Sequence, residues 1–206
     1  MIMYSPISLP YSVNELEPYI DGETVMIHYG KHYMNYLNKL NELLSKYDFN
    51  FNIDKELIIP NINQFSEEDR QDILYNLGGV LNHELYFLNM SPSPQNTIPM
   101  GSVRNAIEDK YGSFENFKEE FIKKANEIKG SGYVFLVVNP NNELDIIKLS
   151  NQDTPYNYGL MPIMAMDFWE HAYYLKHQNE KNKYFDDFFK VTNFSYINNL
   201  YEDKKM

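Results

Sequence analysis

The sequence predicts an α+β protein, with an N-terminal α-helical hairpin followed by a C-terminal α/β domain that contains a three-stranded antiparallel sheet. Two long stretches in the first half, at about 23–46 and 67–89, place apolar residues at helical spacing. Three short apolar runs in the second half are bounded by turn residues, as buried strands are. Between the halves, residues 90–99 are rich in Pro and Ser and show no periodicity. We therefore expect two domains, 1–92 and 93–206.

The first half begins with an arm and a loop around its two helices. Residues 1–20 contain several Pro-adjacent turns and predict an extended, wrapped arm. Asp21-Gly22 precedes the first helix, and the polar stretch 47–66 predicts a loop. The second helix follows this loop directly, which predicts the hairpin.

The second half begins with two further helices, at about 103–110 and 114–128, the latter with Ser113 as its N-cap. Runs 133–138 and 144–149 flank a Pro-Asn-Asn turn and predict a β-hairpin. Run 160–166 predicts the third strand, and helices follow to the C-terminus.

Composition excludes several classes of function. A formal net charge of −11 argues against nucleic-acid and anionic-membrane partners. The absence of Cys excludes disulfides, thiolate metal ligands and a Cys nucleophile. No secretory signal pattern is visible, and no apolar run approaches the ~18 residues that a membrane helix needs. We expect a soluble cytoplasmic protein.

The third predicted strand ends in a charge, at Asp167, and His171 follows four residues later. A charge at such a junction is costly unless something pairs with it or binds it. A carboxylate and an imidazole with this spacing around a tight turn can converge on one metal ion. The alternative is an Asp that caps the next helix and a His that merely packs, and this segment alone leaves both open.

Two more groups of polar residues lie on the predicted helices. His28, His32 and Tyr36 share one stripe of the first helix, where polar aromatic groups need partners. On the second helix, Gly79 precedes His83 by one turn and leaves the surface beside the imidazole bare. A Gly inside a helix costs ~1 kcal/mol relative to Ala, which predicts a packing reason for it.

Four separated motifs resemble those of the iron/manganese superoxide dismutases, in order and in spacing. The most specific is Asp167-Phe-Trp169-Glu170-His171-Ala-Tyr-Tyr174. The other three are the segments 25–36 on the first helix, 77–83 on the second helix, and Asn151-Gln152-Asp between strands. The resemblance therefore spans nearly the whole chain.

The resemblance implies a metal site and a reaction. Its four protein ligands would be His28, His83, Asp167 and His171, with one water or hydroxide completing a trigonal bipyramid. The expected cofactor is one manganese ion per chain, with iron as the alternative, and the expected activity converts superoxide to O₂ and H₂O₂ as the metal alternates between +3 and +2. Three imidazoles and one carboxylate suit zinc as well, so the ligand set alone does not establish redox chemistry.

The resemblance also assigns roles around the metal. His32 and Tyr36 match the gateway pair at the mouth of the substrate funnel and, with Gln152, are expected to pass protons. The family's Gln fills the gap beside the second-helix Gly and hydrogen-bonds the bound solvent. The pairing of Gly79 with Gln152 resembles manganese-type members.

A homodimer is implied as well, with further pairing into tetramers left open. In the family, Glu170 reaches His171 of the partner subunit and Tyr174 reaches the partner's His32, with Trp169 in the same motif. Because superoxide is an anion and the chain is net negative, local cations are needed, and Lys31 and Lys181 are the candidates.

The chain departs from the family pattern around the metal. Phe87, Tyr133 and Phe135 stand where Trp is common, Val80 replaces a frequent His, and Lys181 stands where Arg is frequent. These changes leave the ligands intact but leave the turnover open. Two rival classes are a non-catalytic relative, which is expected to lose ligands, and a metallohydrolase, for which no Glu is placed by motif as general base.

Overall fold

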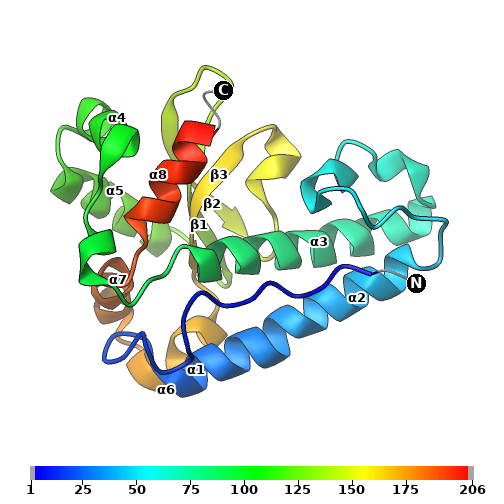
Figure 1. Ribbon diagram of the computed structural model, residues 1–206, viewed down its shortest axis with the longest axis horizontal. Helices are drawn as coiled ribbons and strands as arrows, with labels where there is room; N and C mark the ends of the chain where they lie inside the picture. Colours follow the sequence, from blue (N-terminus) through cyan, green and yellow to red (C-terminus); the bar gives the residue numbers. More distant parts are fainter. Residues whose placement is uncertain (1–2, 204–206) are drawn as a thin grey trace.

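The structure, a computed structural model, describes residues 3–203 and begins with the predicted helical hairpin. Helix α1 (Gly22–Ile27) continues through a π-helical segment (His28–Tyr33) into α2 (Met34–Leu44). This arm packs along α3 (Glu67–Leu88), and Figure 1 shows α2 and α3 side by side. The Asp21 side chain caps α1 by accepting a hydrogen bond from Thr24 N at 2.8 Å.

The π-helical segment is the main departure from the single uninterrupted α-helix expected over 23–46. A π turn holds an extra residue, so side chains before and after it are rotated relative to their places on a regular α-helix. His28 at its start is 1% exposed, whereas His32 within it is only half-buried. The two imidazoles therefore lie at different depths rather than on one stripe.

The segments around the hairpin are tied to it by hydrogen bonds. In the N-terminal arm, which forms no helix or strand over residues 3–20, Tyr11 donates through its hydroxyl to Phe87 O at 3.0 Å. The expected loop 47–66 contains two short 3₁₀ turns, Lys55–Ile58 and Ile62–Gln64.

The second half contains the predicted helices and three-stranded antiparallel sheet. Helices α4 (Gly101–Tyr111) and α5 (Phe114–Asn126) come first, and Ser113 caps α5 by accepting from Asn116 N. The sheet has the order β2-β1-β3. Its strands are β1 (Gly132–Val138), β2 (Leu144–Ser150) and β3 (Met161–Asp167).

The chain ends in a series of short helices. A 3₁₀ turn (Glu170–Ala172) is followed by α6 (Tyr174–His177), α7 (Lys181–Phe189) and α8 (Phe194–Asp203). Two other 3₁₀ turns, Pro94–Thr97 and Pro155–Tyr158, lie in the connections after α3 and after β2.

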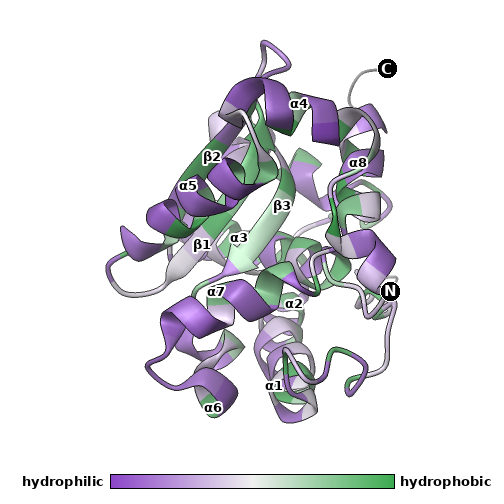
Figure 2. Ribbon diagram, turned by 90° about the vertical axis from the view of Figure 1, so that its left-hand side faces the viewer, coloured by the Kyte–Doolittle hydropathy of each residue, from purple (hydrophilic) through white to green (hydrophobic). Residues whose placement is uncertain are grey.

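The core lies around the central strand. Strand β1 is buried along its whole length, α5 packs on β1 and β2, and α3 and α8 pack against β3. Figure 2 shows the contrast between the largely hydrophobic sheet and the hydrophilic outer helices α5 and α7. Among residues 3–203, no helix is both long enough and apolar enough to span a membrane.

The packing brings three distant parts of the chain to one place. Helix α3 lies against β3, and α1 contacts the 3₁₀ turn that follows β3. The end of β3 therefore lies close to the C-terminal part of α3 and to the start of the π-helical segment.

Candidate metal centre

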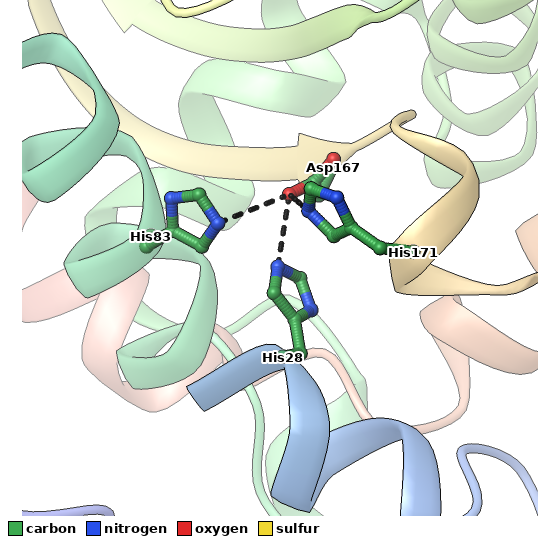
Figure 3. A group of neighbouring side chains, drawn as sticks. All are labelled: His28, His83, Asp167 and His171. Carbon is green, nitrogen blue, oxygen red and sulfur yellow. Dashed lines mark hydrogen bonds and ion pairs between the residues drawn. The ribbon is translucent and has the colours of Figure 1, made fainter. Parts of the chain in front are cut away.

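Four side chains from four elements converge at this point. His28 opens the π-helical segment, His83 lies on α3, Asp167 ends β3, and His171 lies in the 3₁₀ turn. Their potential ligand atoms all lie within 4.8 Å of one another. In Figure 3 the three imidazoles surround the Asp167 carboxylate.

The distances fit a single ion. Asp167 Oδ2 lies 3.1 Å from His28 Nε2, 3.5 Å from His171 Nε2 and 3.9 Å from His83 Nε2. Each of these separations is below about 4.2 Å, the greatest distance that two donors can have when each lies about 2.1 Å from one ion.

Burial and unpartnered nitrogens support the same conclusion. Asp167 and His83 are fully buried, and the His171 side chain is 12% exposed. Within residues 3–203, His83 Nε2 and His171 Nε2 are buried and have no hydrogen-bond partner. Buried polar atoms without partners are rare because they are costly, and a metal ion would accept both lone pairs. The residues therefore fit a mononuclear transition-metal site.

The protonation states are those that metal binding needs. Burial lowers the pKa of His28 to about 4 and lowers the pKa of His83 well below its ordinary value. Burial alone would raise the pKa of Asp167, but the adjacent imidazoles of His171 and His28 hold that pKa below its usual range. At neutral pH, His28 and His83 are therefore neutral and the carboxylate is charged.

Backbone groups orient the ligands. His83 Nδ1 lies 2.6 Å from Gly79 O, and because a carbonyl only accepts, Nδ1 carries the hydrogen and Nε2 is left free. Asp167 Oδ1 accepts from Trp169 N at 2.7 Å, which fixes the carboxylate across the turn. The hydroxyl of Tyr184 donates to Asp167 O at 2.7 Å.

The residues expected at the funnel lie directly against the ligands. His32 stacks on His171, with ring centroids 4.0 Å apart and planes at 17°. The Tyr36 ring lies 5.3 Å from the His83 ring, and its hydroxyl accepts from Gln152 Nε2 at 3.1 Å. Burial and the nearby His171 lower the pKa of His32, while burial raises the pKa of Tyr36.

Two adjacent glycines make room for these groups, in a different arrangement from the one expected. A Cβ on Gly79 would lie 2.5 Å from Cγ and Cδ1 of Tyr36. A Cβ on Gly78 would collide with the backbone oxygen of Gln152. The neighbour of Gly79 is therefore Tyr36, and Gly78, which the sequence reasoning passed over, is the glycine that lies against the Gln152 turn.

The two candidate steering lysines lie in different hollows. Lys31 is exposed and lines a hollow together with His32 and Tyr36. Lys181 lies at the start of α7, with Nζ 4.5 Å from the Phe168 ring centroid, and lines a hollow with Asn126 instead.

The residues expected at a dimer contact lie near the surface. Glu170 is exposed, and Tyr174 is 50% exposed. Trp169 is partly buried: its ring stacks on His171 at 5.6 Å, and its Nε1 donates to Asn151 O at 3.2 Å. Two large apolar side chains, Met26 on α1 and Leu175 on α6, are more than half exposed, and α1 and α6 pack together.

The three aromatic residues that stand where the family commonly has Trp are buried around the site. The Phe87 ring lies 5.0 Å from the His28 ring. Tyr133 places its hydroxyl 3.3 Å from His83 Nδ1, and Phe135 stacks on Tyr133. The hydroxyl of Tyr133 is a polar contact to a ligand that the sequence reasoning did not anticipate.

A helical hairpin and a small α/β domain that share one buried site of three imidazoles and a carboxylate define a protein with a mononuclear metal centre. Comparison with known families identifies which one. Residues 3–91 match the alpha-hairpin domain of the iron/manganese superoxide dismutases, and residues 99–200 match the C-terminal domain of the same family. The chain belongs to this family and is an oxidoreductase, a superoxide dismutase.

Proposed function

We propose that each chain holds one manganese ion, or iron in its place, at His28, His83, Asp167 and His171, and converts superoxide to O₂ and H₂O₂. The observation that carries this assignment is the pair of buried, unpartnered Nε2 atoms beside a buried carboxylate. When bound, the metal supplies the redox couple by alternating between its +3 and +2 states.

Hydrogen bonds within the chain hold two of the ligands in place. Gly79 O fixes the tautomer of His83, and Trp169 N fixes the carboxylate of Asp167. Hydrogen-bond partners of this kind orient metal ligands and tune their basicity. Buried rings, among them Phe87 and Tyr133, exclude water from the side of the site that faces the core.

We assign proton transfer to His32, Tyr36 and Gln152. Tyr36 and His32 are half-buried and line the same hollow, so each connects the buried ligands with solvent. The Gln152 amide donates to the Tyr36 hydroxyl, which leaves the phenol proton free to be given to the reduced product. Lys31 at this hollow supplies a local positive charge for an anionic substrate, whereas Lys181 lines a different hollow.

We further propose a two-fold homodimer through the face formed by α1 and α6. Exposed apolar side chains on neighbouring elements, here Met26, Tyr174 and Leu175, are typical of interaction surfaces. In an isologous contact, Glu170 would reach His171 of the partner subunit, and Tyr174 would reach the partner's His32. Pairing of dimers into tetramers stays a prediction.

Manganese is the metal we favour. Gln152 comes from the turn after β2, and the α3 position one turn before His83 is Gly79. An amide donor at the metal-bound solvent favours hydroxide and the +3 ion, and so lowers the reduction potential. Manganese(III) in water is a stronger oxidant than iron(III), so a manganese enzyme must lower the reduction potential of its metal further than an iron enzyme does.

Reconstitution tests both the activity and the metal. Metal-free protein is loaded with manganese or with iron, and metal per chain and superoxide consumption are measured on the same samples. We expect the manganese form to be the more active one. Comparable activities would show that either metal serves, and loaded protein that consumes no superoxide would overturn the proposed function.

Two other expectations are carried forward as proposals. The domain boundary at 92/93 lies in the connection between α3 and α4, after two ligands and before the other two. The cytoplasmic location is open to test by fractionation of the cells that make the protein.

A further inference from the structure

A cavity of about 160 Å³ lies between the two halves of the chain, and none of the four metal-site residues lines it. The hairpin side contributes the 3₁₀ turn Lys55–Ile58 and α3. The other side is formed by the 3₁₀ turn Pro155–Tyr158, β3 and α8. Because a cavity of about 150 Å³ can hold benzene, this one has room for a ligand of about six non-hydrogen atoms.

Most of the cavity wall is aliphatic. Helix α3 contributes Leu81, Leu85 and Leu88, and the second half of the chain contributes Met161, Pro162 and Leu200. An inorganic ion gains nothing from such a wall, whereas an alkyl chain gains by leaving water. The wall therefore fits an organic molecule with an apolar body.

The charged side chains at the cavity leave one carboxylate unbalanced. Glu84 already has partners, because Lys55 Nζ lies 3.0 Å from its carboxylate and the Tyr33 hydroxyl donates to it at 2.8 Å. Glu56 is half-buried, and no Lys, Arg or His among residues 3–203 forms an ion pair with it. The cavity thus presents a negative charge that has no partner within the chain.

Aromatic rings stand beside this charge. Tyr156 and Tyr196 line the cavity and are both half-buried. Burial, and then the nearby Glu56 charge, raise the pKa of Tyr156, which shows that this phenol and the Glu56 carboxylate are neighbours. A cation close to the carboxylate would therefore also meet the electron-rich face of an aromatic ring.

Thr154 adds an unused hydroxyl to the same wall. The residue is 1% exposed, and its Oγ1 is buried without a hydrogen-bond partner among residues 3–203. Its backbone groups are both occupied, since its N–H donates to Asp153 Oδ1 at 2.9 Å and its carbonyl accepts from Asn157 N at 3.0 Å. Buried polar groups without partners are rare because they are costly, so this hydroxyl points to a ligand that carries a hydrogen-bond donor.

We propose that this cavity binds a small organic cation, a primary ammonium group on a short apolar chain. The ammonium group has three N–H donors, and both the Glu56 carboxylate and the Thr154 hydroxyl can accept from them. The chain would lie against the leucines of α3. A neutral alcohol lacks the charge that Glu56 attracts, and an anion is repelled by it.

The test uses n-butylammonium as the probe, with butan-1-ol and butyrate as neutral and anionic compounds of the same chain length. Glu56→Gln removes the charge, and Thr154→Val removes the hydroxyl while keeping the shape of the side chain. Glu119→Gln is the matched control, because it makes the same change in net charge at an exposed carboxylate on α5 that does not line the cavity. Calorimetry on the metal-loaded protein gives the affinities. The ¹³C-methyl resonances of Leu85 and Leu200, in protein free of paramagnetic metal, locate the probe.

We expect butylammonium to bind and to move both methyl resonances. Butan-1-ol should bind about 10-fold more weakly or less, because it makes no contact between charges. Glu56→Gln should weaken butylammonium binding about 10-fold or more, and Thr154→Val about 2–10-fold. Glu119→Gln should bind the probe as the wild type does.

Three results would overturn the inference. Butylammonium that moves neither methyl resonance does not bind in this cavity. Equal affinities in wild type and Glu56→Gln would remove the carboxylate from the site, and butan-1-ol or butyrate binding as tightly as butylammonium would exclude selection for a cation. None of these readouts depends on superoxide consumption, so failure here leaves the proposed function standing.

Discussion

Replacing Gly79 by Ala tests how the two helices of the hairpin shape the site. The added Cβ would lie 2.5 Å from Cγ and Cδ1 of Tyr36, which are the atoms at the base of the ring. Ordinary carbon–carbon contacts are about 3.5–4.0 Å, so the ring or the helix must move by ~1 Å. Because Cγ lies on the axis about which the ring turns, rotation of the ring about that axis does not relieve the clash.

The expected magnitudes follow from that displacement. Overpacking of this kind costs ~1–3 kcal/mol, and the better helix propensity of Ala returns ~1 kcal/mol. We expect Gly79→Ala to be destabilised by about 0–2 kcal/mol, which corresponds to a fall in Tm of up to ~8 °C. The contact of 3.1 Å between Tyr36 and Gln152 would break, and a misplacement of ~1 Å can cost ~100-fold in rate.

The assay combines thermal unfolding, metal analysis and superoxide consumption. We expect metal content to be retained while activity falls about 10–100-fold. Gly30→Ala is the control for stability, because no atom beyond its chain neighbours and its own helical backbone lies within 4 Å of the added Cβ, and it should gain up to ~1 kcal/mol. If Gly79→Ala kept wild-type activity and gained the full ~1 kcal/mol of stability that Ala's helix propensity provides, the packing of Tyr36 against this glycine would be refuted.

Three further predictions concern the dimer, the pH dependence of stability and the reduction potential. Glu170→Ala should weaken the dimer and metal retention together, the latter ~10–100-fold; a monomeric, fully active variant in sedimentation and activity assays would contradict this. Burial raises the pKa of Glu84 despite the ion pair with Lys55 at 3.0 Å. The folded protein therefore binds the Glu84 proton more tightly than the unfolded chain does. The stability that this proton contributes is present below the ordinary pKa of 4.5 and is lost as pH rises through the raised pKa. In Glu84→Gln the free energy of unfolding should fall less as pH rises. Urea unfolding curves whose pH dependence matches that of the wild type would count against this role of Glu84. Gln152→Leu should raise the reduction potential of bound manganese, bleach the resting protein and reduce activity; redox titration and absorbance check it, and an unchanged potential would exclude the amide from this role.

The sheet could be predicted closely because its signals are local. Each strand is a short apolar run between turn residues, and the three observed strands start and end within one residue of the predicted runs. The π-helical segment at His28–Tyr33 could not be predicted, because the same residues show an ordinary helical period. Its register depends on tertiary packing that brings His28 to Asp167.

The site could be predicted only through the order and spacing of its motifs. His28 and Asp167 are far apart in the sequence, and no periodicity states that they meet at 3.1 Å. The contacts of Gly79 with Tyr36 depend on how closely α2 and α3 approach each other. The position of the Tyr133 hydroxyl depends likewise on the strand register opposite Asp167, which hydrophobic patterns leave open.

The most direct test of the account compares wild-type protein with His83→Ala, measuring manganese and iron per chain together with superoxide consumption. The account predicts one ion per wild-type chain, with activity proportional to bound metal, and the loss of both in the variant, because His83 is one of the four converging ligands. Full activity in His83→Ala, or superoxide consumption by wild-type protein that has been stripped of metal, would contradict it.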